Sequence, residues 1–413
     1  MNLIEYKSSI ISLFLRNTRS GFADWRDCPR LCENVIESLE TAQEDFVTQG
    51  NYADLFELAN WTYVNWSDTE KDDSGGETQE FCNCIYDIWE GVYAEGTDSI
   101  SSDQMLDGLI ELLDGRLVDF MEDDVYKFIL EHFNRIDQLE RKEQFLLQRM
   151  EEIKRGIPEN ESLQFLLPVI EHYYARVLAD QKKPIQEIRD FLNTKDSYTN
   201  KELLAQIETS YGNYSEAIAI YRGLITERPD SYWSDGHRKS LMEIYKAQGD
   251  TALYNAELYR MMCDHPGDSQ YYLNYKALFS KEEWLEKWKD LLTVFSERLT
   301  LIHIWLSTEG RYDLIMDSAE PDYAFLVEKY RDKLVELYPE RCLKVLANSA
   351  DNEVKIAKNR RNYKGVVRTL EKIATYPGGK ELAIELAVKY KSQYPLKTAL
   401  KDELRLFTER VQR

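Results

Sequence analysis

Residues that form tight turns are scarce in this chain. Only 18 glycines and 10 prolines occur among 413 residues, whereas leucine, glutamate, lysine, alanine and glutamine recur in runs that favour helix. Disorder along the whole chain is excluded, because 43% of the residues are hydrophobic and 27 tyrosines and 8 tryptophans can fill a core. The composition therefore predicts a nearly all-α protein.

Long hydrophobic runs are missing as well. A membrane-spanning helix needs about 18 or more consecutive apolar residues, and the apolar patch at residues 10–15 is too short even for a secretory signal. The six cysteines are scattered, which is typical of reduced thiols and not of a disulfide framework. We therefore expect a soluble, intracellular, cytoplasmic protein that does not enter a membrane.

The sequence contains no recognised catalytic motif. Its five histidines stand apart, outside any HExxH motif, and no glycine-rich loop of the GxxxxGK[ST] or GxGxxG type occurs. Paired carboxylates are so common in this acidic chain that no single pair indicates acid–base chemistry. We predict a protein that is not an enzyme and binds no cofactor. An enzyme whose site gathers several His or Cys side chains in a deep pocket stays open as an alternative.

Two short pairs of cysteine and histidine raise the question of zinc. Cys82 and Cys84 form one pair, and Cys263 and His265 form the other, but residues 85–262 lie between them. A local zinc finger cannot close over that separation. Cys82 and Cys84 fall in an amphipathic run, where residues two apart point in different directions from a helix. We expect them to be buried free thiols and predict no metal site.

The acidic segment SDTEKDDSGGE, residues 67–77, raises the question of calcium. An EF-hand loop requires glycine at its sixth position and glutamate at its twelfth. Counted from Asp68, these positions hold Asp73 and Gln79. We therefore expect a solvated loop between two helices.

Charge is distributed unevenly along the chain. The net charge is −22, and residues 33–124 hold 25 acidic and two basic residues, which sum to −23. Residues 354–413 hold 15 basic and six acidic residues, which sum to +9. Two interpretations stay open: both segments are solvated helical faces, or they dock, on each other or on an oppositely charged partner.

One pattern occurs twice in the middle of the chain. Gly212 precedes Pro229 by 17 residues, Gly249 precedes Pro266 by 17, and the two glycines are 37 apart. On each side of both glycines, apolar residues recur at steps of three and four, as in an amphipathic helix. Glycine can end the first helix in the left-handed conformation, and proline can follow the second without losing a hydrogen bond. The pattern predicts antiparallel helix pairs.

These residues resemble the tetratricopeptide repeat (TPR). The second helix of that repeat carries a small residue, an aromatic residue four positions later and a terminal proline, which Ala217, Tyr221 and Pro229 match. The second copy departs from the family at Tyr254, where a small residue belongs. The resemblance implies an all-α fold, a superhelical, TPR-like α-solenoid of antiparallel helix pairs. Segments with weaker similarity to the glycine turn occur at residues 50–52, 309–315 and 360–367.

Composition also suggests how the chain is divided. The segment RGIPEN, residues 155–160, places Gly and Pro after a charged helix. We expect an acidic N-terminal helical domain at residues 1–155 and a TPR-like helical repeat domain with a basic C-terminal end at residues 156–413. Helices are expected at about 31–48, 52–66, 78–94, 102–120, 123–134, 138–154 and 161–193, with helix pairs from 199 onward.

The C-terminal segment carries a second resemblance. It is similar to the end of the helical region of bacterial SWIM zinc-finger proteins, and the loop at residues 72–77 is similar to a loop of that region. The zinc finger itself is absent, because its closely spaced Cys-x-Cys and Cys-x-His pairs do not occur together. The resemblance implies a bacterial protein associated with a SWIM-type system. The matching residues are Tyr363, Val366, Val367, Leu370, Gly378, Gly379, Ala383, Leu386, Ala387, Tyr394 and Pro395.

Two surfaces are candidates for binding. In the TPR family, first-helix side chains on the concave side hold extended peptides, which implies a protein-binding groove here. A basic patch near the C-terminus, with Tyr363 interleaved, could contact phosphates. We therefore predict a scaffold or adaptor that binds another protein, with a nucleic-acid-associated accessory protein as the alternative. The groove candidates are Glu202, Gln206, Thr209, Lys239, Glu243 and Lys246, and the basic patch comprises Lys355, Lys358, Arg360, Arg361, Lys364 and Arg368.

Overall fold

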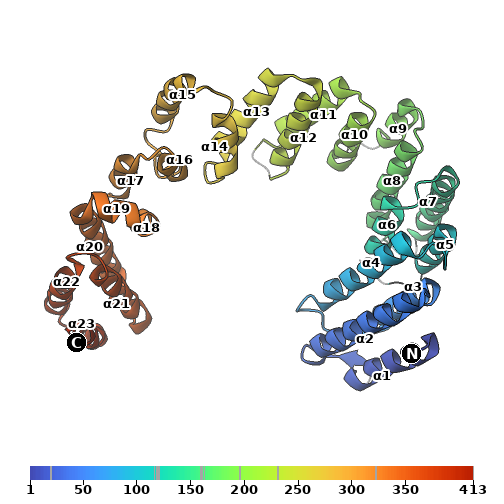
Figure 1. Cartoon of the computed structure of the whole chain (residues 1–413), viewed down its shortest axis with the longest axis horizontal. Coiled ribbons are helices and arrows are strands. Elements are labelled where there is room, and N and C mark those ends of the chain that lie inside the picture. Colours follow the sequence, from blue (N-terminus) through green and yellow to red (C-terminus); the bar gives the residue numbers. More distant parts are fainter. Residues whose placement is uncertain are drawn as a thin grey trace. The chain divides into compact units, whose positions relative to one another are not determined.

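Figure 1 shows a computed structural model of the chain. The structure describes residues 1–18, 21–115, 117, 121–158, 161, 163–194, 197–229, 232–320 and 323–412. These residues form 23 helices and two short strands, which confirms the predicted all-α, TPR-like solenoid of antiparallel helix pairs. Contacts divide the chain into two compact units, Met1–Leu224 and Ile225–Arg413. The domain boundary expected after residue 155 lies inside the first unit, in the last turn of a helix that ends at Gly156, and stays a prediction.

The first unit begins with long helices and continues with shorter pairs. Its elements are α1 (Leu3–Asn17), β1 (Phe22–Ala23), α2 (Asp27–Gln49), α3 (Tyr52–Asp68), β2 (Glu70–Lys71), α4 (Glu77–Glu95), α5 (Ser102–Leu112), α6 (Met121–Glu131), α7 (Ile136–Gly156), α8 (Leu163–Asp180), α9 (Ile185–Leu192), α10 (Tyr198–Ser210) and most of α11 (Tyr214–Glu227).

The second unit contains the remaining helices. They are α12 (Tyr232–Gln248), α13 (Thr251–Asp264), α14 (Ser269–Lys276), α15 (Lys281–Val294), α16 (His303–Thr308), α17 (Tyr312–Ala319), α18 (Ala324–Lys329), α19 (Arg331–Leu337), α20 (Pro339–Ile356), α21 (Arg360–Ala374), α22 (Gly379–Gln393) and α23 (Thr398–Gln412).

Four of the helix pairs share one turn. At Gly212 the backbone takes φ +76°, the Gly212 N–H donates to the Thr209 carbonyl, and the next N–H donates to the Glu208 carbonyl. These two bonds form a Schellman motif, which ends a helix and needs a left-handed residue. The same pair of bonds, with a positive φ, occurs at Gly50, Gly249 and Gly310. Of the three segments with weaker similarity to the glycine turn, residues 50–52 and 309–315 thus contain a helix turn of this kind, whereas residues 360–367 lie within α21.

A fifth turn of this kind lies between α8 and α9. Lys182 takes φ +56°, its N–H donates to the Ala179 carbonyl, and the Lys183 N–H donates to the Leu178 carbonyl. This turn divides the stretch 161–193, which was expected to be helical throughout. The helix expected at 102–120 is also shorter, because α5 ends at Leu112 before a turn in which Gly115 has φ +72°. Residues 116 and 118–120 lie outside the described residues.

Aromatic side chains fill much of the core in both units, as predicted. In the first unit Trp66 stacks on Phe81 at 4.6 Å between ring centroids, and both are buried. In the second unit Tyr272 stacks on Trp305 at 5.2 Å, and both are buried. The repeat residues Ala217, Tyr221 and Tyr245 are buried as well. Large aromatic rings supply the area that pairs of short helices need to hold together.

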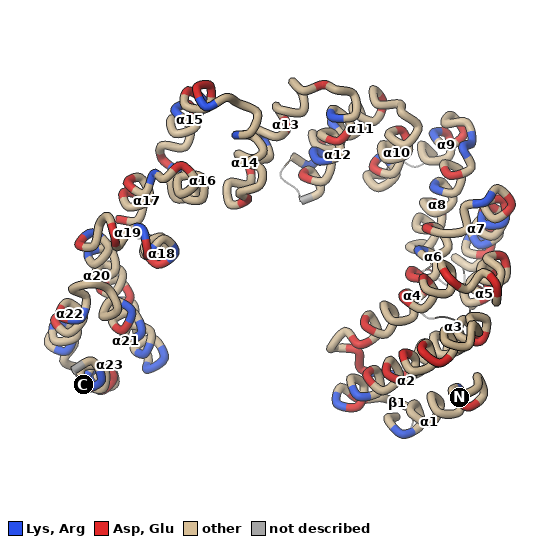
Figure 2. The backbone as a smooth tube through the Cα atoms, in the orientation of Figure 1, with Lys and Arg blue, Asp and Glu red and all other residues tan. Residues whose placement is uncertain are grey.

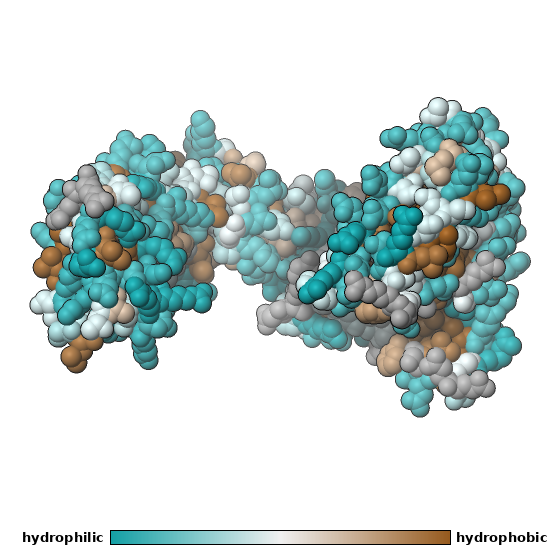
Figure 3. All heavy atoms as spheres, turned by 90° about the horizontal axis from the view of Figure 1, so that it is seen from below, coloured by the Kyte–Doolittle hydropathy of each residue, from teal (hydrophilic) through white to brown (hydrophobic). Residues whose placement is uncertain are grey.

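The surface is mostly polar. Hydrophilic side chains cover most of the face seen in Figure 3, and hydrophobic ones gather in small patches. On α1, the exposed Ile4, Ile11 and Leu15 follow helical spacing and share one face. Among the described residues, no helix is both long enough and apolar enough to span a bilayer.

Candidate functional site

The predicted groove residues fall on two helices, one in each unit. On α10, Gln206 is exposed, whereas Glu202 and Thr209 are half-buried, and the Thr209 hydroxyl donates to the Ala205 carbonyl at 2.7 Å. On α12, Lys239, Glu243 and Lys246 are all exposed. We call these three side chains the α12 row. Because they are spaced by four and three residues, they share one face of the helix.

The opposite face of α12 is fixed in place. Leu241, Ile244 and Tyr245 are at most 1% exposed. Arg238, only 3% exposed, donates through Nη1 to Glu257 of α13 at 3.1 Å. A buried guanidinium that has lost its solvent requires such a partner. The α12 row is therefore carried by a helix whose rotation is restricted.

A second buried ion pair supports α10. Glu208 is 1% exposed and accepts hydrogen bonds from Arg189 Nε at 2.5 Å and Arg189 Nη2 at 3.0 Å. Its other contact is with Asn213 Nδ2, at 2.8 Å, just past the Gly212 turn. One carboxylate thus connects α9, α10 and the turn. Sequence reasoning missed it, because a glutamate beside Ile207 has no pattern that marks it as buried.

The six residues of the basic patch lie at the end of α20, in the link that follows it and along α21. All six are exposed, and Figure 2 marks basic positions in blue along the backbone of α21. Arg360 forms an ion pair, because its Nε donates to Glu403 of α23 at 2.8 Å. Arg361, Lys364 and Arg368 have no ion-pair partner among the described residues. The structure therefore brings the predicted patch together and leaves much of it unneutralised.

Two shallow grooves run along the α21 part of this patch. One has a volume of about 500 Å³ and lies between α21 and residues of α18 and α19. The other, of about 590 Å³, lies between α21 and α23. Arg368 lines both grooves, and Glu371 also lines both. The surface is therefore mixed in charge and not uniformly basic.

Tyr363, the aromatic residue predicted to interleave with this patch, is not exposed for contact with a nucleic acid. Tyr363 is 7% exposed, and it packs with Val366 and Leu370 on the buried side of α21. Lys397 lies over its ring at 5.7 Å. A ring in this position cannot stack on a nucleic-acid base, as sequence-tolerant binding to single strands requires.

The acidic segment 33–124 runs from within α2 through α3, α4 and α5 to the start of α6, and Figure 2 marks acidic positions in red along the backbone of α2, α3 and α4. Of its two basic residues, Lys71 is half-buried, and its Nζ donates to the Trp66 and Thr69 carbonyls. Burial lowers the pKa of Lys71 below its ordinary value. The other, Arg116, lies outside the described residues. The acidic character of this surface is therefore not offset by exposed lysine or arginine side chains in its described part.

The six cysteines are free thiols. Cys82 is buried, as expected, with its Sγ 3.6 Å from the Tyr63 hydroxyl, whereas Cys84 is only half-buried. Burial raises the pKa of both thiols to about 12. The thiol form of these two side chains is therefore favoured at neutral pH.

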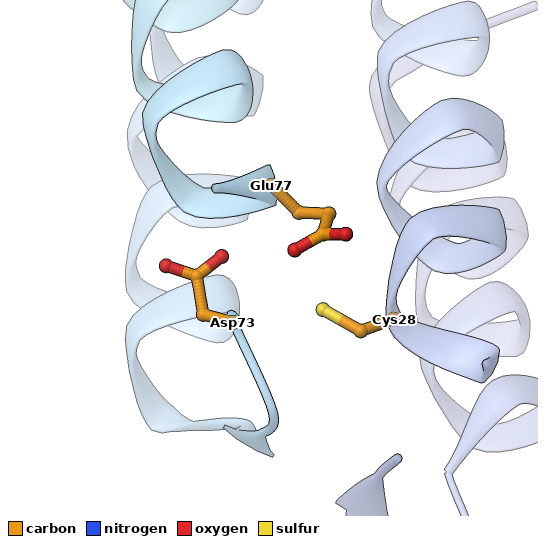
Figure 4. Close-up of side chains that lie close together, drawn as sticks. All are labelled: Cys28, Asp73 and Glu77. Atoms are coloured by element: carbon orange, nitrogen blue, oxygen red, sulfur yellow. The ribbon is translucent and has the colours of Figure 1, made fainter. Parts of the chain in front are cut away.

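A group that sequence analysis did not predict lies beside the 67–77 loop. Cys28 of α2, Asp73 of the loop and Glu77 at the start of α4 point toward one another (Figure 4). One ligand atom from each lies within 4.8 Å of the others. The pKa of the Cys28 thiol is raised to about 11, first by burial and then by the nearby carboxylates of Glu77 and Asp73. The loop was expected to be merely solvated, but β2 pairs with β1 and draws it toward α2.

Comparisons with known proteins identify helical-repeat structures at low similarity. No protein-family model and no curated protein matches the sequence. The structure of Naa15/Naa10 bound to HypK-THB is similar at 13% identity and a TM-score of 0.31, over 99% of this chain and 67% of that chain. Yeast Tom70 is similar at 12% identity and a TM-score of 0.25, over 92% and 96%. A circular tandem repeat protein follows at 15% identity and a TM-score of 0.18, over 94% and 90%.

Proposed function

We propose that the chain is a non-enzymatic, intracellular scaffold that binds another protein through the exposed polar faces of its repeat helices. The observation that carries this proposal is the α12 row. Three long charged side chains stand free on one face of a helix whose opposite face is buried and held by the Arg238–Glu257 pair. Rigid elements that present side chains at fixed spacing suit recognition, because little conformational freedom is lost on binding.

The dimensions of the row indicate the size of the partner. From Lys239 to Lys246 the helix rises about 10 Å, at about 1.5 Å per residue. An extended peptide covers this length with about three residues. So short a contact is weak by itself, so the partner must be a longer segment that also contacts other helices. The alternation of Lys, Glu and Lys favours a partner with both signs of charge, which sets specificity and the rate of association.

Charge reversal of the α12 row tests the proposal. The variant Lys239→Glu, Glu243→Lys, Lys246→Glu would be compared with Glu286→Lys, Lys287→Glu, Lys289→Glu on the exposed face of α15. Both variants change the net charge equally, and both sites lie in the second unit. Partners captured from the native host would be identified by mass spectrometry, purified and titrated against each variant.

We expect a partner whose affinity falls at least tenfold with the α12 variant and is unchanged with the α15 variant. Equal binding by the wild type and both variants would refute the role of the α12 row. Failure to recover any partner that binds the purified wild type would refute the scaffold function.

A nucleic-acid-associated role is the second candidate. The exposed, unpaired Arg361, Lys364 and Arg368 favour it, whereas burial of Tyr363 and the neighbouring Glu371 and Glu403 count against it. Phosphate contacts give binding that weakens steeply with salt. The wild type should be retained on a nucleic-acid column at low salt, and the double variant Arg361→Glu/Arg368→Glu should not be retained. Flow-through of the wild type would refute this role.

Association with a SWIM-type system is the most specific part of the proposal. Its support is the set of matching residues between Tyr363 and Pro395, of which Tyr363, Val366, Leu370, Ala383 and Leu386 form buried faces of α21 and α22. A bacterial host in which the encoding gene neighbours a SWIM zinc-finger protein, and co-purification of the two, would support it. Independent purification of the two proteins from such a host would count against it.

A further inference from the structure

The loop between α3 and α4 is held against the start of α2 by backbone pairing. β1 and β2 run parallel, with Phe22 opposite Glu70 and Ala23 opposite Lys71, and the Asp72 N–H donates to the Ala23 carbonyl at 2.9 Å. This pairing brings Asp73 and Glu77 to Cys28, some 45 residues earlier in the chain. The arrangement is therefore a built feature of the fold and not a chance approach of a free loop.

Two of the three groups have buried atoms without a hydrogen-bond partner among the described residues. Cys28 is fully buried, and its thiol has no hydrogen-bond partner among the described residues. The Oε2 atom of Glu77 is also buried and has no hydrogen-bond partner. Buried polar atoms are almost always satisfied in folded proteins. A buried thiol and an unpartnered carboxylate oxygen that face each other form a geometry that suits a cation.

Ordinary structural roles account for only part of the cluster. Asp73 Oδ1 accepts from the Thr78 N–H at 2.7 Å, so the first turn of α4 explains its position. That contact does not involve Glu77 Oε2 or Cys28 Sγ. Lys71 is the nearest lysine in sequence, but its ammonium is directed to the Trp66 and Thr69 carbonyls, and neither carboxylate forms an ion pair among the described residues.

We propose that Cys28, Asp73 and Glu77 bind a zinc ion, with a water molecule in the fourth position. A thiolate with two carboxylate oxygens matches the ligands of Zn²⁺, whereas Ca²⁺ and Mg²⁺ are bound by oxygen alone. As the Zn–S bond forms, the thiol proton passes to solvent. The thiolate and the two carboxylates then carry three negative charges, of which Zn²⁺ neutralises two. In a tetrahedral zinc site the ligand atoms lie about 3.4–3.7 Å apart, so atoms that lie within 4.8 Å of one another need to close by at most about 1.4 Å.

Gly75 allows the Glu77 carboxylate to take its position. A Cβ on residue 75 would overlap the Glu77 carboxyl group. Gly75 does not have a left-handed φ, so alanine fits its backbone. Because the Glu77 side chain is flexible, the variant Gly75→Ala is expected to displace the carboxylate without unfolding the chain.

The full-length protein, stripped with a chelator, tests the site by titration with Co²⁺ and with Zn²⁺. Co²⁺ bound to a thiolate gives an intense charge-transfer absorption, which reports on sulfur ligation directly. The variants are Cys28→Ser, Glu77→Gln and Gly75→Ala. The controls are Glu80→Gln, an exposed carboxylate one turn along α4, and Cys263→Ser in the second unit. Circular dichroism verifies that each variant is folded.

We expect one metal ion per chain, loss of the charge-transfer absorption in Cys28→Ser, and at least a tenfold lower affinity in Glu77→Gln and in Gly75→Ala. The two controls should bind as the wild type does. Absence of stoichiometric binding by the wild type would overturn the proposal. An absorption that persists in a folded Cys28→Ser variant, or that is lost in Cys263→Ser, would overturn it equally.

Discussion

The glycine that ends α10 offers a direct test of the repeat architecture. At Gly212 φ is +76°, and a methyl group added there would meet no atom within 4 Å. Gly212→Ala therefore introduces no clash, and its whole cost is conformational. Forcing an L-residue into the left-handed region costs about 1–2 kcal/mol, and the lower flexibility of alanine in the unfolded chain offsets somewhat less than 1 kcal/mol of this. We expect a net loss of about 1 kcal/mol of stability.

Gly223 supplies the matched control on the next helix. It lies inside α11, is exposed, and a methyl group added there would also meet no atom within 4 Å. In a helix interior alanine is more favourable than glycine by about 0.5–1 kcal/mol. Gly223→Ala is therefore expected to stabilise the protein, although it makes the same chemical change as Gly212→Ala.

Urea denaturation measures both variants. With a slope of about 2 kcal/mol per molar urea, the midpoint should fall by roughly 0.5 M in Gly212→Ala and rise by roughly 0.3–0.5 M in Gly223→Ala. Circular dichroism and tryptophan fluorescence should follow coincident transitions, because the conversion to free energy requires this. A neutral or stabilising Gly212→Ala, or equal shifts in the two variants, would refute the left-handed turn between α10 and α11.

Two further predictions concern residues of α7 and the turn that precedes α9. Lys182 takes φ +56°, a conformation that is strained for any residue other than glycine. Lys182→Gly should therefore stabilise the protein by about 1 kcal/mol, as measured by urea denaturation. A destabilised variant would show that the Lys182 backbone is not strained. Lys142 is 1% exposed, and burial lowers its pKa to about 8 from 10.5. Because the unfolded chain binds this proton more tightly, the stability of the wild type relative to Lys142→Met should rise by about 2 kcal/mol between pH 7 and 9.5. A difference that stays constant over this range would show that the Lys142 pKa is not lowered.

The sequence was most informative at helix ends where glycine takes the left-handed conformation. Gly50, Gly212, Gly249 and Gly310 were recognisable, because glycine readily takes the left-handed conformation that ends a helix. Lys182 forms the same turn but could not be found in this way, because lysine has no such preference. The left-handed conformation of Lys182 therefore leaves no signal in a local pattern.

The candidate surfaces were predictable only in part. Arg360, Arg361, Lys364 and Arg368 could be recognised as exposed because they avoid the apolar stripe of α21. The same stripe indicates that Tyr363, three residues before Val366, is buried. The grouping of Cys28 with Asp73 and Glu77 could not be predicted. It depends on strands of two residues, which are too short to leave a periodic signal.

The contacts within each unit link helices that are close along the chain, such as α1 with α2 and α3, or α21 with α22 and α23. Each hairpin can therefore bury its apolar side as soon as the next one or two helices have been synthesised, without waiting for a distant segment. During translation the growing chain should leave the ribosome as a succession of nearly finished hairpins. Only a short segment of unprotected hydrophobic sequence is then exposed to aggregation at any moment.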